Sequence, residues 1–186
     1  MKQRILKLLD VEPQESGPVF LLLAISFMLG MFLATVTVAS QSLFLTHFNE
    51  SFDLPRALVI SGILGLITTA IYNFLQGRIP FSLLAIGSLS VVLILTAFIE
   101  FGEYFVSDIN NLYYYGFTLI LPFTFVSQLV FWGSFERMFN LRQSKRIIGS
   151  VDLGTMVAQI LAFFTIPVLL QFGVPITTLL PSVFSV

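Results

Sequence analysis

The run PVFLLLAISFMLGMFLATVTVASQSLFL, residues 18–45, carries no charged side chain and decides the class of this protein. A helix needs about 20 predominantly apolar residues to cross the hydrocarbon core of a bilayer. The same pattern recurs at 55–75, 80–99, 112–135 and 147–172, and a sixth apolar stretch covers only 175–186. We therefore expect an all-α integral membrane protein with five complete spans and an incomplete sixth. The short sixth stretch predicts that the chain is part of a longer polypeptide.

The composition agrees with an integral membrane protein and excludes several classes of function. Only 10% of the 186 residues are charged and 56% are hydrophobic, whereas a soluble domain carries about 25% charged residues. The net charge of −1 gives no basis for binding nucleic acid, and the absence of cysteine excludes disulfides and thiolate metal sites. No Ser-His-Asp set, histidine cluster, phosphate-cradling glycine loop or carboxylate pair is found in a span. We expect no enzyme activity, no metal site and no cofactor.

The basic residues orient the chain. All but one of the nine Lys and Arg residues fall on the N-terminal side of the predicted spans, and only Arg56 falls on the other. Positive charge in short loops stays on the cytoplasmic side, so we predict a cytoplasmic N-terminus in the cytoplasmic (inner) membrane. Residues 1–16 alternate basic and apolar side chains before a polar segment, which predicts an interfacial amphipathic helix. Residues 17–186 then form the transmembrane bundle.

Small residues recur at helical spacing in three spans, which predicts seams where helices approach closely in lipid. The members of these stripes are Ser26, Gly30 and Ala34; Ser61, Gly65 and Thr69; and Ser150, Gly154, Ala158 and Ala162.

A weak internal repeat connects the two halves of the chain. The segment ASQSLF at 39–44 resembles VSQLVF at 126–131, and SGILG at 61–65 resembles SVDLG at 150–154. Each match is three helices apart, so the second copy enters the membrane from the opposite face. That arrangement is the inverted 3+3 repeat found in each half of major facilitator transporters. We expect a six-helix half bundle of that type, with its sixth helix incomplete.

Asp152 is the acidic residue placed inside a predicted span. With Lys145, Thr155 and Gln159 it shares one helix face, so one interpretation is a polar strip that lines a cavity. The other, which we favour because Asp152 lies near the inner surface, is a salt bridge to Arg142, Arg146 or Arg78. Charge in mid-membrane costs about 2.5–3.5 kcal/mol on insertion scales, so either role needs a partner.

Two further groups are candidates. The segment from Glu136 and Arg137 to Arg142, Lys145 and Arg146 either attracts phosphate groups at the cytoplasmic mouth or only keeps this loop inside. Gln41 and Gln128 occupy equivalent repeat positions. They either face a central cavity or bond each other across helices for about 1 kcal/mol. Pro122 and Pro167 are candidate kinks in their spans.

The segment FWGSFERMFNLRQSKRIIGSVDLG, residues 131–154, resembles the ATP:ADP antiporter (nucleotide transporter) family of the major facilitator type. The start LLDVEPQE, residues 8–15, and Leu43-Phe44-Leu45 are similar as well. The resemblance implies a twelve-helix parent with this chain as its N-terminal half. It also implies transport of a nucleotide or another polar organic anion by alternating access. The tentative substrate-binding residues are then Gln41, Gln128, Asp152, Gln159, Lys145 and Arg146, and the gating or structural charges are Arg78, Glu136, Arg137 and Arg142.

The chain departs from that family late in the first span. Family members carry charged residues there that help hold the nucleotide, whereas residues 37–42 of this chain read TVASQS and carry no charge. An alternative function is therefore a transport-inactive membrane anchor, scaffold or sensor module. It would be linked to a soluble domain, to the remainder of a longer polypeptide or to partner subunits. A homodimer of six-span chains is a third, less favoured possibility.

Overall fold

The computed structural model describes residues 16–48, 52–102 and 109–172. The predicted interfacial segment, except Ser16, and the sixth predicted span lie outside the described residues. Within them the chain is helical throughout, with short turns between helices. The helices are α2 (Ser16–His47), α3 (Asp53–Gln76), α4 (Phe81–Phe101), α5 (Ile109–Thr118), α6 (Ile120–Met138) and α7 (Leu141–Gln171).

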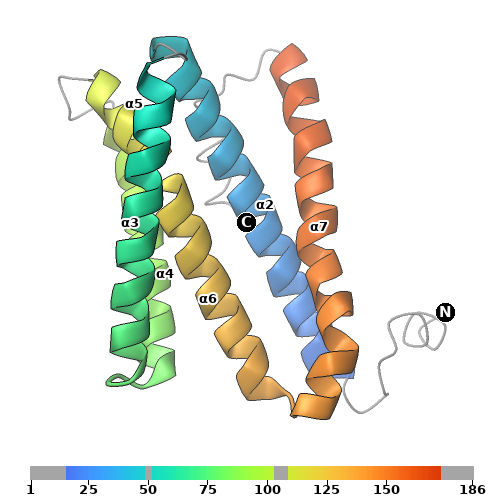
Figure 1. Cartoon of the computed structure of the whole chain (residues 1–186). Coiled ribbons are helices and arrows are strands. Elements are labelled where there is room, and N and C mark those ends of the chain that lie inside the picture. Colours follow the sequence, from blue (N-terminus) through green and yellow to red (C-terminus); the bar gives the residue numbers. More distant parts are fainter. Residues whose placement is uncertain (1–15, 49–51, 103–108, 173–186) are drawn as a thin grey trace.

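Five helical segments are long and apolar enough to cross a membrane, as the sequence predicts. They are α2, α3, most of α4, the pair α5 and α6 taken together, and α7. The five stand side by side as an open bundle (Figure 1). The all-helical architecture and these five segments fit an integral membrane protein. Many large apolar side chains lie on the outside of the bundle, such as Leu66 at 71% exposure and Ile94 at 67%. Such a surface is favourable in contact with lipid and unfavourable in contact with water.

The fourth span is two helices. A turn at Leu119 separates α5 from α6, and the break falls within one turn of Pro122. Proline has no N–H to donate to the carbonyl four residues earlier, so the helix is interrupted where that bond is missing. Hydrogen bonds from Leu119 N to Tyr115 O and from Phe123 N to Leu119 O, both 3.0 Å, hold the two pieces together. Pro167, in contrast, lies inside the continuous helix α7.

α7 begins at Leu141, earlier than the predicted start at 147, so the basic segment 142–146 is helix and not loop. The reason is local. The Asn140 carbonyl accepts the Ser144 N–H at 2.8 Å, and the Gln143 side chain accepts the Asn140 N–H at 3.0 Å. This is the return half of a capping box, which satisfies a backbone donor that the start of a helix leaves free. The turn from α6 to α7 is therefore only Phe139 and Asn140.

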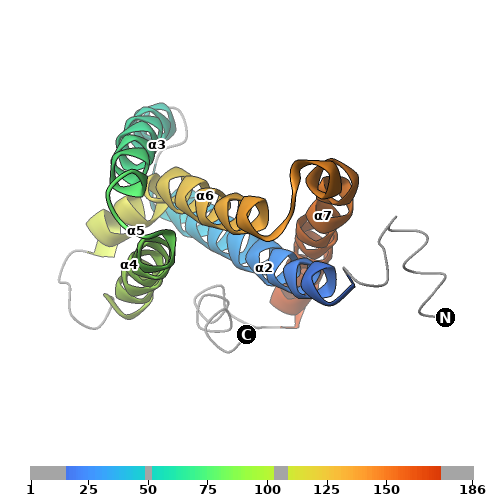
Figure 2. The ribbon, with the colours of Figure 1, turned by 90° about the horizontal axis from the view of Figure 1, so that it is seen from below.

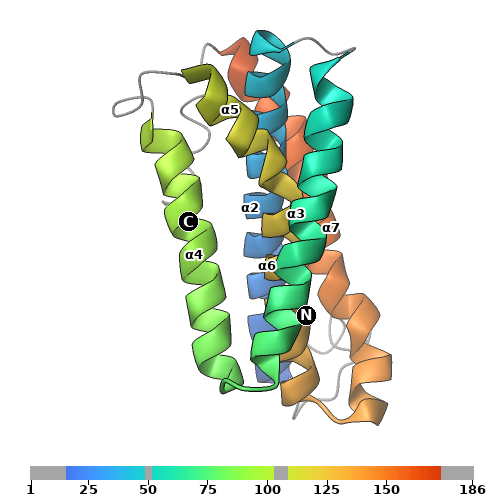
Figure 3. The ribbon, with the colours of Figure 1, turned by 60° about the vertical axis from the view of Figure 1, so that its left-hand side comes forward.

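Contacts between the helices are most extensive for α2 with α7, followed by α3 with α6. Figure 2 shows α2 and α6 in the middle, α3 and α4 to one side and α7 to the other, and Figure 3 shows α4 standing apart from α3 along most of its length. One buried cluster joins α2, α3, α4 and α6 and includes Val36, Tyr72, Val92 and Val126. A second joins α2, α6 and α7 through Leu22, Phe135 and Val151.

Candidate functional site

The seam between α2 and α7 is built from small and hydroxyl side chains. The Ser26 hydroxyl donates to the Val151 carbonyl at 2.7 Å, and its oxygen lies 2.8 Å from the Thr155 hydroxyl. A β-carbon at Gly30 would stand 2.6 Å from the Thr155 carbonyl. The predicted stripes of the first and fifth spans therefore meet each other, and the prediction of packing seams is confirmed for this pair. The stripe of the second span packs against α6, where Gly65 meets the Phe125 ring.

The predicted polar strip on α7 does not stay together as one surface. Thr155 is buried in the seam with α2, Lys145 is exposed, and Asp152 and Gln159 are half-buried at its edge. The salt bridge favoured for Asp152 is not formed, since no basic side chain within the described residues pairs with its carboxylate. Helix geometry explains this. Arg142 and Arg146 are not three or four residues from Asp152, the spacing that pairs side chains on one helix.

Gln41 and Gln128 do not bond each other. The Gln128 side chain is half-buried and accepts a hydrogen bond from the Trp132 indole N–H at 3.0 Å on the same helix, α6. Gln41 is exposed near the end of α2. It lies two turns beyond Ala34, which packs on α7, at the end where α2 and α7 diverge (Figure 1). Of the two alternatives for this pair, the bond between helices is therefore absent from the described part of the chain.

Basic side chains gather at one end of the bundle, which we call the basic end. This end holds the α3–α4 turn and the α6–α7 turn (Figure 1). Here the Arg78 guanidinium lies 4.2 Å from the centroid of the Phe74 ring, and that of Arg137 lies 4.2 Å from the centroid of Phe81. Glu136 is exposed beside them. The members of the basic end are Arg78, Arg137, Arg142, Lys145 and Arg146.

The charged and amide side chains predicted to bind substrate therefore lie along one side of α7 and at the basic end of the bundle. They do not converge on one pocket in the described part of the chain. Lys145, Asp152 and Gln159 follow one side of α7 inward from the basic end, and Arg146 is half-buried on that helix. Gln128 lies on α6 and Gln41 on the far part of α2. An anion arriving at the basic end would meet Arg142 and Lys145 first, because both are exposed there.

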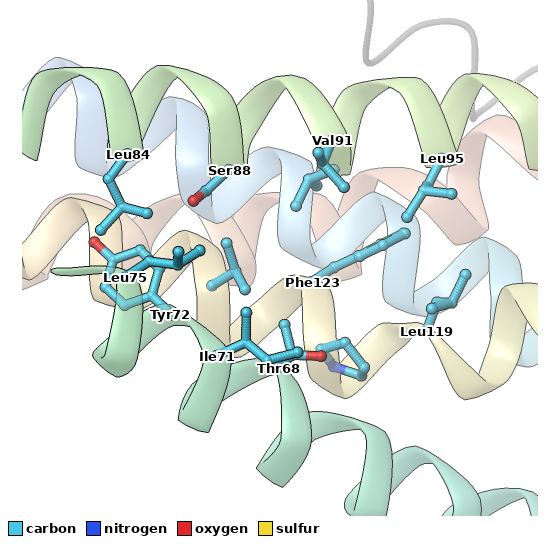
Figure 4. A pocket seen from close by; sticks show the side chains of 13 residues that line it. Thr68, Ile71, Tyr72, Leu75, Leu84, Ser88, Val91, Leu95, Leu119 and Phe123 are labelled. Atoms are coloured by element: carbon cyan, nitrogen blue, oxygen red, sulfur yellow. The ribbon is translucent and has the colours of Figure 1, made fainter. Parts of the chain in front are cut away.

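Sequence reasoning missed a cavity between α3, α4 and α6. Its volume is about 240 Å³, and its walls are almost entirely apolar (Figure 4). The Tyr72 side chain lines it, is only 4% exposed, and has a hydroxyl with no hydrogen-bond partner. None of the predicted substrate-binding residues lines this cavity. A tyrosine within an otherwise apolar stretch was the only signal in the sequence.

The chain matches no protein-family model, and no curated protein and no solved structure matches it either. The resemblance to the ATP:ADP antiporter family stays a prediction from the residues quoted above. What identifies the chain is its architecture, a bundle of apolar helices that fits an integral membrane protein.

Proposed function

We propose that the chain is the N-terminal half bundle of a major-facilitator-type secondary transporter that moves a nucleotide or another polar organic anion by alternating access. The observation that carries this proposal is the pairing of the helices. In the predicted repeat, the first span corresponds to the fourth and the second to the fifth. Under that correspondence, the pair of helices α2 and α7 maps onto the pair α6 and α3. These two pairs have the most extensive contacts between helices in the bundle. A two-fold axis in the membrane plane requires such an exchange.

The direction of the pairs supports the same proposal. Along α2 and α7 the contacts run in register, from Ser26 with Val151 to Gly30 with Ala158, so the two helices are parallel. The helices α3 and α6 are parallel too, because two reversals of direction separate the second span from the fourth. Each pair joins a helix of one repeat to a helix of the other. The two pairs therefore hold the half bundle together as one body, and rigid-body rocking in alternating access needs such a body.

The charge distribution favours an anionic substrate. Among the described residues, the basic end places five cations against the single carboxylate of Glu136 at the same end. A cleft mouth of one sign raises the local concentration of ions of the opposite sign. In this proposal Arg142 and Lys145 attract phosphate or carboxylate groups, and Arg146 lies next to them on α7. Gln159, Gln128 and Gln41 offer neutral donors and acceptors deeper in the membrane. The basic end is then cytoplasmic.

Transport assays on the full-length polypeptide test this function. Proteoliposomes loaded with ADP should take up labelled ATP, or a labelled non-nucleotide organic anion, above the level of empty liposomes. Lys145→Gln should raise KM about 10-fold or more, since a hydrogen bond to a charged group contributes about 1.5–3 kcal/mol. Arg56→Gln, at the opposite end of the bundle, is the matched control and should leave KM unchanged. Failure to accumulate any of these anions would overturn the proposal.

One observation favours the alternative of a transport-inactive anchor, scaffold or sensor module. The two glutamines do not converge, and the outer part of α2 around Thr37 and Ser40 carries no charge. A nucleotide brings several negative charges, and uncharged groups bind phosphate more weakly than a charged donor does. Replacing Gln41 and Gln128 by leucine separates the two functions. Uptake that falls in the double variant supports transport, whereas an unchanged phenotype in cells together with no uptake supports the alternative.

A further inference from the structure

The cavity between α3, α4 and α6 is chemically unlike a passage for a polar solute. Its walls are formed by apolar side chains that include Ile71, Leu75, Leu84, Val91 and Phe123. Of the hydroxyl groups in the wall, Thr68 already donates to the Leu64 carbonyl of its own helix at 2.7 Å. Burying a polar group without a partner costs several kcal/mol. The cavity therefore favours a hydrocarbon occupant.

The length of the cavity matches one leaflet of a bilayer. Leu84 and Leu95 line it three turns apart on α4, which is roughly 16 Å along the helix axis. The hydrocarbon core is about 30 Å thick, so the cavity spans about half of it. In Figure 4, Tyr72 and Leu84 lie at one end of the cavity, and Leu95 and Leu119 lie at the other. Leu84 is close to the α3–α4 turn, so the first of these ends is next to the basic end of the bundle.

Two arginines belong to the segments that adjoin that end of the cavity. Arg78 is in the turn that follows Leu75, and Arg137 reaches from α6 to stack on Phe81, one turn before Leu84. Neither cation pairs with a carboxylate in the described part of the chain. The aromatic rings occupy one face of each guanidinium and leave the planar N–H fork free. Such a fork binds phosphate oxygens in a bidentate manner.

The acidic groups nearby do not neutralise these arginines. Glu136 is next to Arg137 on α6 but is exposed and forms no ion pair with a described residue. Asp152 lies on α7, on the other side of α6 from α3 and α4 (Figure 2). Positive charge therefore predominates where the cavity meets the basic end.

Tyr72 supplies the third contact. Its side chain lines the cavity and is 4% exposed, and its hydroxyl is buried with no hydrogen-bond partner. A buried hydroxyl left without a partner is costly, so an acceptor from a ligand would satisfy it. Tyr72 precedes the last residue of α3, Gln76, by one turn, or about 6 Å of depth. That depth suits an ester carbonyl of a glycerolipid whose phosphate lies at the level of Arg78.

We propose that this cavity binds one anionic glycerophospholipid from the leaflet at the basic end. One acyl chain occupies the apolar cavity, an ester carbonyl accepts a hydrogen bond from Tyr72, and the phosphate lies between Arg78 and Arg137. The site is separate from the proposed transport function, because none of the residues assigned to the transported anion lines it.

Native mass spectrometry of the full-length polypeptide tests the site. The protein is released from bilayers that contain equal amounts of phosphatidylglycerol and phosphatidylcholine with identical acyl chains. We expect one phosphatidylglycerol molecule to be retained in preference to phosphatidylcholine. The double variant Arg78→Gln with Arg137→Gln should lower that preference at least about tenfold. Both lipids carry a phosphate, and the two native guanidinium groups repel the choline cation that only phosphatidylcholine carries. Arg142→Gln removes a cation of the basic end that does not border the cavity, and it should retain the preference.

A second pair of variants tests the cavity itself. Val91→Trp fills the space from α4, and we expect it to reduce retention of phosphatidylglycerol. Ile94→Trp places the same side chain on the same helix, at a position that is 67% exposed and does not line the cavity, and it should bind as the native chain does. Tyr72→Phe keeps the ring and removes only the hydroxyl, so it should weaken retention of both lipids and leave the preference between them unchanged.

Equal retention of the two lipids by the native chain would overturn the proposal. So would arginine variants that still select phosphatidylglycerol, because the charge of Arg78 and Arg137 would then not decide between the two lipids. A cavity that Val91→Trp leaves fully occupied would overturn it as well. These outcomes do not depend on whether the chain transports an anion.

Discussion

At the scale of single residues, two glycines set how closely α2 and α7 approach. A β-carbon at Gly30 would lie 2.6 Å from the Thr155 carbonyl oxygen and 2.8 Å from the Ala158 β-carbon, and one at Gly154 would lie 2.8 Å from the Leu23 carbonyl. Two of these three neighbours are backbone atoms, which move only if the whole helix moves. The close approach lets Ser26 and Thr155 form their hydrogen bonds across the seam.

We predict that Gly30→Ala destabilises the bundle by about 1–3 kcal/mol, the usual cost of forcing extra volume into a packed contact. Unfolding of the purified protein in mixed micelles, followed by circular dichroism against increasing denaturing detergent, measures the change.

Gly62→Ala is the matched control, because a β-carbon at Gly62 meets nothing within 4 Å. Alanine is the better helix former by about 1 kcal/mol, so this variant should be as stable as the native chain or slightly more so. Equal stability of the Gly30 and Gly62 variants would contradict the close approach of α2 and α7.

At the scale of helices, the pairing of α2 with α7 joins two segments that are far apart in the sequence. Three points on α2, namely Ser26, Gly30 and Ala34, meet successively later points on α7. The order of the contacts fixes both the partner and its direction. The α6–α7 turn is short because the Asn140 and Gln143 cap starts α7 at once, and α7 can then run alongside α2 for most of its length.

The chain contains no native cysteine, so a designed pair reports on this contact without background. We predict that Ser26→Cys with Thr155→Cys forms a disulfide on mild oxidation in membranes, because the two native hydroxyl oxygens are 2.8 Å apart. A mass shift or altered gel mobility that reverses with reductant would detect it. Ser26→Cys with Met156→Cys is the control and should remain reduced, because Met156 is 52% exposed and lies on a different side of α7. A cross-link in the control alone would reverse the assigned face of α7.

At the scale of the whole molecule, charge is separated between the two ends of the bundle. In the part of the chain that the structure describes, every Lys and Arg except Arg56 lies at the basic end. Moving these cations through the bilayer is costly, so we predict that insertion keeps them on the cytoplasmic side. The same separation places the proposed substrate entrance and the proposed lipid phosphate at one membrane surface.

We predict that a cysteine at position 140, from Asn140→Cys, reacts with a membrane-impermeant maleimide only after cells are permeabilised. Thr46→Cys, at the opposite end of α2, should react in intact cells. Both native side chains are exposed, so access to the reagent and not burial decides the result. Labelling of position 140 in intact cells would reverse the orientation and with it the proposed direction of substrate entry.

The sequence alone determined the number and position of the five apolar helices, because the thickness of the bilayer sets the length of an apolar run. It also predicted that the small residues of the first and fifth spans form packing seams, since in lipid small residues let helices approach closely. The apolar pattern did not reveal two boundaries that local hydrogen bonding sets. These are the start of α7 at Leu141 and the break between α5 and α6 at Leu119.

The tertiary structure alone decided which of the polar residues meet. It separated Gln41 from Gln128, left Asp152 without the expected salt bridge, and placed Thr155 in a seam rather than on a polar strip. It also created the cavity beside Tyr72, which none of the predicted substrate-binding residues lines. The physical reason is that helical periodicity tells which side chains share a face of one helix. Distances between helices depend instead on which helices pair and how closely their backbones approach, and these follow from packing over the whole bundle.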